Sequence, residues 1–186
     1  MSPRVGMSLT MIIKAAADIA NQKGLNEVTL ATVSKTLNVK SPSLYNHVNG
    51  LRGIKTELAV RGLTMLYEEM SASVKGLNGE RALLSLADAY IGFAEANPGL
   101  YEASLQKIED SRLEKLSGLI VRLVVGQLTS NGYAESGTAI HAARGLRSLL
   151  HGFAVLRKQT AFELSESIRD SRLFATRTFL NGLKIN

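Results

Sequence analysis

Residues 28–54 contain two short helix-forming segments separated by a tight turn, and this pattern constrains the fold more than any other part of the chain. Thr29 predicts the start of the first helix, because its hydroxyl can accept a hydrogen bond from a free backbone amide of the first turn. Val28 and Val33 flank this position at the spacing of a hydrophobic staple. Asn38 predicts the end of the helix, because asparagine tolerates the left-handed backbone conformation of a sharp turn.

A second short helix is predicted to begin at Ser41 and Pro42. Serine is a good N-cap, and the fixed φ angle and missing amide of proline are harmless at the first helical position. Leu44 and Val48 continue the buried face, which leaves polar residues pointing outward and Tyr45 near the boundary. Small polar side chains and an aromatic one at the front of a second helix are suited to contacts with base edges and phosphates in a DNA major groove.

The candidate DNA-contacting residues share a predicted position on the exposed side of this segment or a positive charge beside it. They are Thr29, Lys40, Ser41, Pro42, Ser43, Tyr45, Asn46, His47, Arg52 and Lys55. The alternative interpretation is a plain helical hairpin inside an all-α bundle. In that case the spacing, the proline position and the aromatic residue would be coincidental.

The same segment resembles the TetR family of transcriptional regulators. The resemblance covers residues 10–58 and includes a preceding helix, 11–23, that closes at Gly24. It rests on Val33-Ser34-x-x-Leu37-Asn38-Val39 and on Pro42-Ser43-Leu44-Tyr45-x-His47-Val48. The resemblance implies a three-helix DNA-binding domain over residues 1–53 and a larger helical domain for ligand sensing and dimerisation over residues 54–186.

Three residues depart from the family pattern. The family usually has glycine where Asn38 stands, alanine where Ser34 stands and a phosphate-binding lysine where Leu51 stands. The first two changes are mild, because asparagine can adopt the turn conformation and serine is small enough for close helix approach. Leucine cannot bind phosphate. The phosphate contact would therefore pass to Arg52, Lys55 or Lys40.

The charge distribution supports a nucleic-acid partner for the same part of the chain. Residues 1–61 carry 8 basic and 3 acidic side chains, a net charge of +5, whereas residues 62–186 carry 14 and 13, a net charge of +1. Clustered positive charge is expected where a protein meets phosphate. The alternative is a solvated basic surface without a partner. The coincidence of the positive charge with the helix-turn-helix argues against this alternative.

Composition limits the remaining possibilities. The chain has 186 residues, no cysteine and 3 prolines. It can bury a full core, but it has no disulfide and no thiolate metal site. We find no apolar run near the ~18 residues of a membrane span and no apolar core of a secretory signal at the start. We therefore expect a soluble cytoplasmic protein that does not bind membranes. With few clustered β-branched residues, the expected fold class is all-α.

Downstream of the helix-turn-helix, Gly, Asn and Pro residues divide the chain into further helices with no repeat or low-complexity segment. Apolar residues recur at helical spacing within each segment, and the sequence Asn97-Pro98-Gly99 separates two of them. The predicted helices cover residues 51–74, 80–95, 100–106, 111–129, 136–159 and 164–183.

The last two predicted helices are apolar on more than one face, so each needs two sets of neighbours. One set is the helix's own domain, and the second is a partner subunit across a two-fold axis. In the TetR family the closing helix pair forms the dimer interface. The alternative is that both are central helices of a monomer core. The candidate interface residues are Leu146, Leu150, Phe153, Leu173 and Phe174.

The sequence contains no pattern typical of an enzyme. The only histidines are His47, His141 and His151, and the last two stand ten residues apart, off a common helix face. There is no Gly-x-Ser-x-Gly elbow and no phosphate-binding loop, and Glu109-Asp110 fits a solvated helix start better than an acid–base pair. We expect no catalytic activity, no cofactor and no metal site.

An apolar ligand pocket is expected among the helices between residues 80 and 159, because sites between helices are usually apolar with a few orienting polar groups. The candidate ligand-binding residues are Tyr90, Phe93, Tyr101, Leu105, Arg147 and His151. Core packing is the alternative for Tyr90, Phe93 and Leu105, and a structural ion pair for Arg147. The effector itself is not identified by the sequence.

The expected function is a homodimeric, ligand-responsive repressor that binds a roughly palindromic double-stranded DNA operator and responds to a small-molecule effector. One alternative is a ligand-independent or corepressor-driven regulator. A second, from a different class, is an all-α carrier or interaction bundle.

Overall fold

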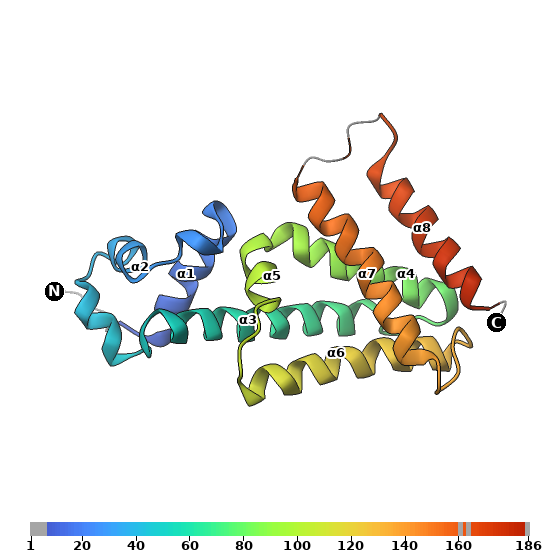
Figure 1. Cartoon of the computed structure of the whole chain (residues 1–186), viewed down its shortest axis with the longest axis horizontal. Helices are drawn as coiled ribbons and strands as arrows, with labels where there is room; N and C mark the ends of the chain where they lie inside the picture. Colours follow the sequence, from blue (N-terminus) through green and yellow to red (C-terminus); the bar gives the residue numbers. More distant parts are fainter. Residues whose placement is uncertain (1–6, 160–161, 163–164, 185–186) are drawn as a thin grey trace. The chain divides into compact units, whose positions relative to one another are not determined.

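A computed structural model describes residues 7–159, 162 and 165–184. In these residues all regular structure is helical, which confirms the predicted all-α class (Figure 1). In chain order the elements are α1 (Leu9–Lys23), η1 (Leu25–Glu27), α2 (Leu30–Thr36), η2 (Ser41–Asn46), α3 (Gly50–Ser73), α4 (Gly79–Ala96), α5 (Pro98–Ser104), α6 (Ser111–Ser130), α7 (Ala139–Lys158) and α8 (Ile168–Leu183).

The helices predicted after the helix-turn-helix are present, with ends shifted by a few residues. The long helix α3 runs over Gly50–Ser73 where residues 51–74 were predicted. The last helix, predicted from residue 164, begins at Ile168, where Ser167 accepts a hydrogen bond from the Asp170 amide and acts as N-cap. Residues 163 and 164 lie outside the described part of the chain.

The described residues form two compact units. The first takes its residues from the ranges 1–64 and 97–113, and the second from 65–96 and 114–186. Helix α3 contributes residues to both units. By packing, α5 belongs to the same unit as the helix-turn-helix. The functional boundary after residue 53 stays a prediction.

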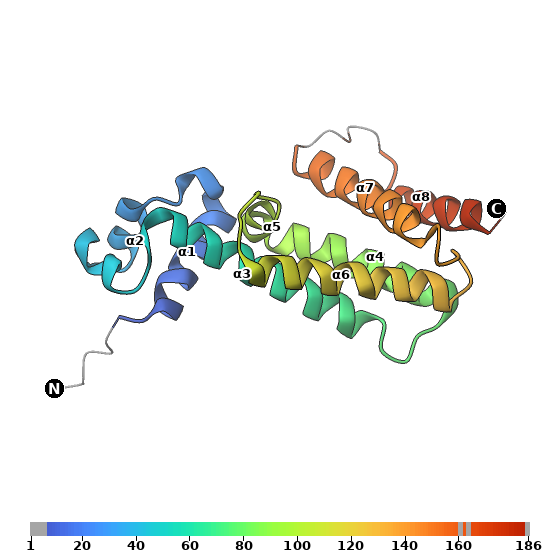
Figure 2. The ribbon, with the colours of Figure 1, turned by 60° about the horizontal axis from the view of Figure 1, so that its bottom comes forward.

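In the first unit, glycines let α5 approach α1 and α3 closely (Figure 2). A Cβ atom on Gly62 of α3 would lie 2.5 Å from the carbonyl oxygen of Leu100 in α5. Gly99 faces the backbone of Ala20 in α1 in the same way. The side-chain Oδ1 of Asn21 accepts hydrogen bonds from the backbone N–H of Gly99 at 2.9 Å and of Leu100 at 3.2 Å. These contacts attach α5 to α1 and α3, the helices on either side of the helix-turn-helix.

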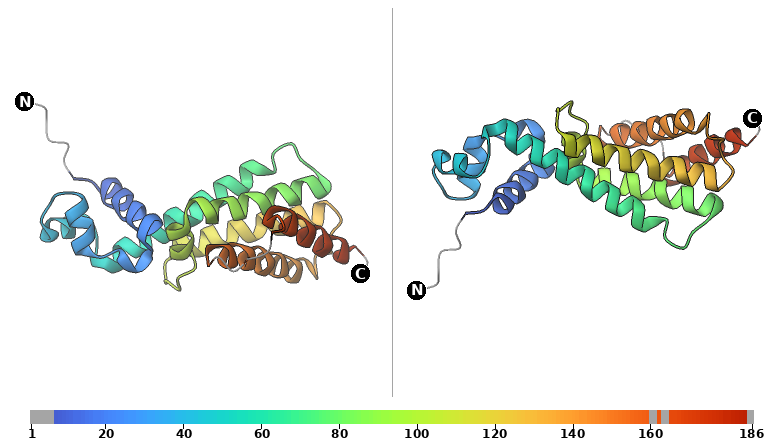
Figure 3. Two further views of the ribbon diagram at one scale, coloured as in Figure 1. Left: turned by 90° about the horizontal axis from the view of Figure 1, so that it is seen from above. Right: turned by 90° about the horizontal axis from the view of Figure 1, so that it is seen from below.

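In the second unit, α4, α7 and α8 pack against one another and α6 runs alongside (Figure 3). The apolar core between them includes Leu83, Leu86, Phe93, Leu146, Leu150 and Leu180. Three ion pairs, each with at least one well-exposed partner, join α4 to α7 and α8: Arg157–Glu95 at 2.6 Å, Arg172–Asp88 at 2.7 Å and Arg177–Glu80 at 2.9 Å. Such pairs add little stability, so burial of apolar side chains holds this unit together.

Among the described residues, none of the helices combines the length and the apolar character that a membrane span requires.

Candidate DNA interface

The first helix of the motif, α2, begins where the sequence predicts it. Thr29 Oγ1 accepts the backbone N–H of Thr32 at 3.0 Å, and Thr32 Oγ1 accepts the backbone N–H of Thr29 at 2.9 Å. These reciprocal bonds form a capping box built from two threonines. Val28 and Val33 are both buried, as a hydrophobic staple requires. The Thr29 hydroxyl is thus engaged in capping the helix.

The turn after α2 also follows the prediction. Asn38 has a φ of 53°, in the left-handed region. The N–H of Asn38 donates to the carbonyl of Lys35 at 3.2 Å, and the N–H of Val39 donates to the carbonyl of Ser34 at 3.0 Å. This pair of bonds is the Schellman motif, which satisfies carbonyls left free at a helix end. The turn therefore has one defined geometry and sets the direction of the segment that follows.

That following segment corrects the prediction in two respects. Residues Ser41–Asn46 form the 3₁₀ helix η2 and not an α-helix, and the N-cap is Lys40, so Ser41 does not cap the helix. The Ser41 hydroxyl instead lies 2.9 Å from the hydroxyl of Ser34 in α2. The chain turns again at Gly50, which has a φ of 62°. Few residues separate the turns at Asn38 and Gly50, and a 3₁₀ helix, with hydrogen bonds between residues three apart, is typical of such short segments.

The recognition segment, residues 41–47, presents its polar and aromatic side chains to solvent. Leu44 and, just after the segment, Val48 are buried beneath it, as predicted. Tyr45 is 60% exposed, so it projects into solvent and does not lie at the boundary as predicted. Asn46 and His47 are exposed as well, whereas Ser43 is half-exposed. Three consecutive positions, 45–47, thus lie between buried Leu44 and Val48 and offer an aromatic ring, an amide and an imidazole to a partner.

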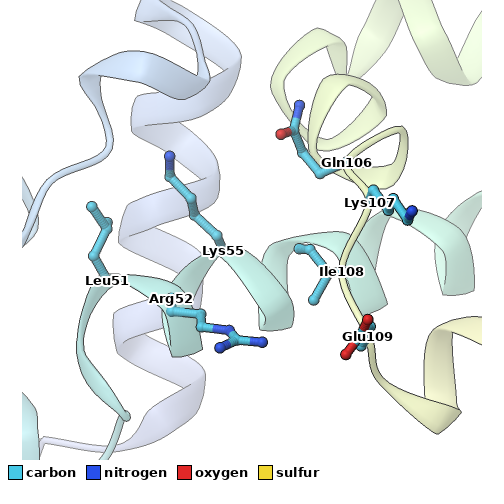
Figure 4. Close-up of a pocket in the computed structure, with 7 residues that line it drawn as sticks. All are labelled: Leu51, Arg52, Lys55, Gln106, Lys107, Ile108 and Glu109. Carbon is cyan, nitrogen blue, oxygen red and sulfur yellow. The ribbon is translucent and has the colours of Figure 1, made fainter.

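Positive side chains continue from this segment onto α3. Among them, Lys40 and Arg52 are exposed and Lys55 is half-buried. The uncharged candidate Pro42 is exposed as well. Leu51, Arg52 and Lys55 line one side of an open groove of about 590 Å³ in the first unit (Figure 4). The other side comes from the loop after α5, with Gln106, Lys107, Ile108 and Glu109. The sequence gives no sign of this pairing, because the loop lies about fifty residues further along the chain.

An ion-pair cluster beside the groove joins α3 to the start of α6 within the first unit. Arg112 bonds Glu57 of α3 and Asp110, each at 2.8 Å. Asp110 caps α6, because its Oδ1 accepts the N–H of Arg112 at 2.8 Å. The side-chain hydrogen bond from Arg112, followed by the backbone bond, lowers the pKa of the Asp110 carboxyl below its ordinary value. The same bonds to Asp110 and Glu57 raise the pKa of Arg112.

Known proteins carry the same combination of elements. Residues 83–179 match the family model described as the tetracyclin repressor-like C-terminal domain. Over 186 residues the chain is 58% identical to the Bacillus subtilis (strain 168) protein named Uncharacterized HTH-type transcriptional regulator YobS, covering 100% of this chain and 97% of that protein. The chain belongs to the TetR family of transcriptional regulators.

Solved structures agree with this TetR-family fold. A protein of unknown function from Rhodococcus sp. RHA1 has a TM-score of 0.84 at 19% identity, covering 99% of this chain and 100% of that one. The TetR family transcriptional regulator PfmR from Thermus thermophilus has a TM-score of 0.67 at 16% identity, covering 91% and 97%. At these identities the similarity concerns the fold alone.

The candidate ligand-binding residues of this TetR-family chain fall on both compact units. Tyr90 and Phe93 of α4 and Arg147 and His151 of α7 belong to the second unit, and Tyr101 and Leu105 belong to the first. Phe93 is fully buried, which supports core packing for this residue. Arg147 and Leu105 are exposed, and Tyr101 is buried.

The candidate dimer residues divide in a similar way. Leu146 and Leu150 are buried within the second unit itself, which assigns them to its core and leaves no surface for a partner. Phe153 and Leu173 are half-buried. Phe174 of α8 is 73% exposed, the most exposed large apolar side chain among the described residues. Of the five, Phe174 is the residue that a partner subunit can cover most.

In the described part of the chain, no cluster of His, Asp or Glu side chains has an arrangement suited to a metal ion.

Proposed function

We propose that this TetR-family regulator binds a roughly palindromic DNA operator as a homodimer and that a small-molecule effector controls this binding. The observation that carries the proposal is the exposed row Tyr45, Asn46 and His47, supported from below by buried Leu44 and Val48. Side chains held on a short rigid element can read base edges without a large loss of conformational entropy on binding.

The positive side chains around this row have a different role. Lys40, Arg52 and Lys55 carry no ion pair to any described residue, so their charge is available to phosphates. Phosphate contacts orient a protein on the duplex but carry no sequence information. Because Leu51 is apolar, Arg52 and Lys55 would provide the contacts at the start of α3.

The proposal is tested by fluorescence anisotropy with an operator duplex and a scrambled duplex over a range of salt concentrations. Tyr45→Ala and His47→Ala should each weaken operator binding by about 1–3 kcal/mol and leave folding intact, because both side chains are exposed. Lys55→Ala should weaken binding to both duplexes and reduce the salt slope by about one. Lys75→Ala, an exposed lysine beyond the end of α3, is the control and should change neither.

Unchanged operator affinity in both Tyr45→Ala and His47→Ala would remove these residues from the interface. DNA binding itself would be contradicted if the affinity of the unmodified chain for every duplex were no higher at low salt than at high salt.

Effector control requires that the effector prefer one state of the protein. A ligand that weakens operator binding by a given factor must bind the operator complex more weakly than the free protein by the same factor, typically about 5–150-fold. Titration of an identified effector against both forms measures this factor. Equal affinities would favour the alternative, a regulator that does not respond to that ligand. Exposed Arg147 is the residue whose replacement by alanine should reduce the response and spare DNA affinity.

A further inference from the structure

Two serine hydroxyls join α2 to the recognition segment. Ser34 of α2 is 5% exposed, and its Oγ lies 2.9 Å from the Oγ of Ser41, the first residue of η2. The same Ser34 Oγ lies 3.0 Å from the backbone carbonyl oxygen of Ala31. Ser41 itself is half-exposed, and its hydroxyl bonds no other described polar group. A buried hydroxyl therefore holds the first side chain of the segment proposed to meet DNA.

The direction of these two bonds follows from proton accounting. A serine hydroxyl has one proton to donate and lone pairs to accept with, whereas a carbonyl oxygen only accepts. Ser34 must donate its proton to Ala31 if that bond is to form. Its Oγ can then only accept from Ser41. Both bonds exist together only when the Ser41 hydroxyl donates to Ser34, so the proton of Ser41 is committed inside the protein.

This commitment leaves Ser41 with outward-facing acceptor capacity only. Phosphate oxygens, guanine O6 and N7 and thymine O4 are also acceptors and cannot bond it. In the major groove only the amino groups of adenine N6 and cytosine N4 donate. We propose that Ser41 recognises an adenine or cytosine amino group, and that Ser34 is a positioning residue that sets this preference without touching DNA. The inference rests on the proposed DNA binding.

The test uses the full chain and duplexes enriched by it from a random pool. Anisotropy is then measured on the enriched consensus and on duplexes with each half-site base pair exchanged. Ser41→Ala should lose about 2- to 12-fold discrimination at one adenine or cytosine position and keep its affinity for the other exchanges. Ser34→Ala frees the Ser41 proton, so at the same position guanine and thymine should become acceptable.

Two further variants separate this role from a purely structural one. Ser73→Ala is the matched control, because Ser73 makes the same kind of bond to the carbonyl three residues earlier, at 2.8 Å, and has no serine partner in the recognition segment. It should leave every base preference unchanged. In a Ser41→Ala background, Ser34→Ala should have no further effect on base preference, since it acts only through Ser41.

Several results would overturn the inference while DNA binding stands. The first is a uniform loss of affinity for all duplexes in Ser41→Ala, which would indicate a phosphate contact. The second is unchanged base preference and affinity in Ser41→Ala. The third is a base-preference shift caused by Ser34→Ala that persists in the Ser41→Ala background. A change only in thermal stability in Ser34→Ala would also overturn it. If the unmodified chain enriches no duplex, the proposed function fails instead.

Discussion

Asn38 and Gly62 are two residues whose backbone position allows few side chains. Asn38 adopts a left-handed φ of 53°, a conformation that costs most residues roughly 1–2 kcal/mol and that asparagine tolerates better. Gly62 has no such φ requirement but lacks space, because a Cβ there would lie 2.5 Å from the oxygen and 3.2 Å from the carbon of the Leu100 carbonyl. Backbone atoms cannot move aside as a flexible side chain can.

Replacing Gly62 by alanine should therefore destabilise the chain. We expect Gly62→Ala to lower the free energy of unfolding by about 1–3 kcal/mol through overpacking of α3 against α5. The control is Gly92→Ala in α4, where an added Cβ meets nothing within 4 Å. That exchange should raise stability by about 0.5–1 kcal/mol. Denaturant unfolding followed by circular dichroism measures both, and equal effects would contradict the close approach.

The starts of α5 and α6 in the first unit are tied to other helices by side-chain bonds. Asn21 of α1 binds the first amides of α5, and Asp110 caps α6 while sharing Arg112 with Glu57 of α3. Free amides at a helix start need such partners, and a carboxylate there also interacts favourably with the helix dipole. The starts of these two helices thus depend on where the neighbouring helices α1 and α3 lie.

The Asp110 cap makes a defined contribution to the pH dependence of stability. Because the folded pKa of Asp110 is lowered from its ordinary value of 3.8, its stabilisation is present above about pH 4 and is lost as pH falls through the folded pKa. Asp110→Asn should therefore be less stable than the unmodified chain at neutral pH, and the difference should shrink below about pH 4.

Thermal unfolding at several pH values measures this difference. Glu109→Gln is the control, because Glu109 makes no ion pair with any described residue. A stability difference between Asp110→Asn and the unmodified chain that stays constant across the acid range would contradict the assignment.

At the scale of the whole molecule, most of the net charge lies in the N-terminal part of the chain. The net charge of +5 over residues 1–61 coincides with the helix-turn-helix. The most exposed large apolar side chain of the described residues, Phe174, stands on α8. In a two-fold dimer, two recognition segments about 34–36 Å apart would contact successive major-groove turns of DNA, which is why we expect a palindromic operator.

Phe174→Glu should split the proposed homodimer, because a charge would replace an apolar side chain at the interface. Tight operator binding should be lost with it, since two half-sites no longer act together. Val121→Glu is the matched control: Val121 is an exposed apolar residue of α6, outside the closing helix pair. Light scattering at micromolar concentration decides. A Phe174→Glu chain that stays dimeric, or an unmodified chain that is monomeric, would contradict this interface.

The sequence by itself determined the features that arise from residues close together in the chain. The cap at Thr29, the left-handed turn at Asn38 and the helix stops at proline and glycine involve hydrogen bonds between residues at most a few positions apart. Composition, with few clustered β-branched residues, likewise determined the all-α class, and the spacing of Leu44 and Val48 determined their burial. Local backbone geometry is sufficient for these results.

Only the tertiary structure decided which surfaces meet. Periodicity marks Leu150 and Phe174 alike as apolar, yet one is 2% and the other 73% exposed, because helix packing covers only the first. The Ser34–Ser41 bond, the contact of Gly62 with Leu100 and the bridge from Arg112 to Glu57 also have no signature in the sequence. The physical reason is that the pattern of polar and apolar residues specifies whether a side chain must be buried or hydrogen-bonded. The relative placement of the helices specifies which residue it then contacts.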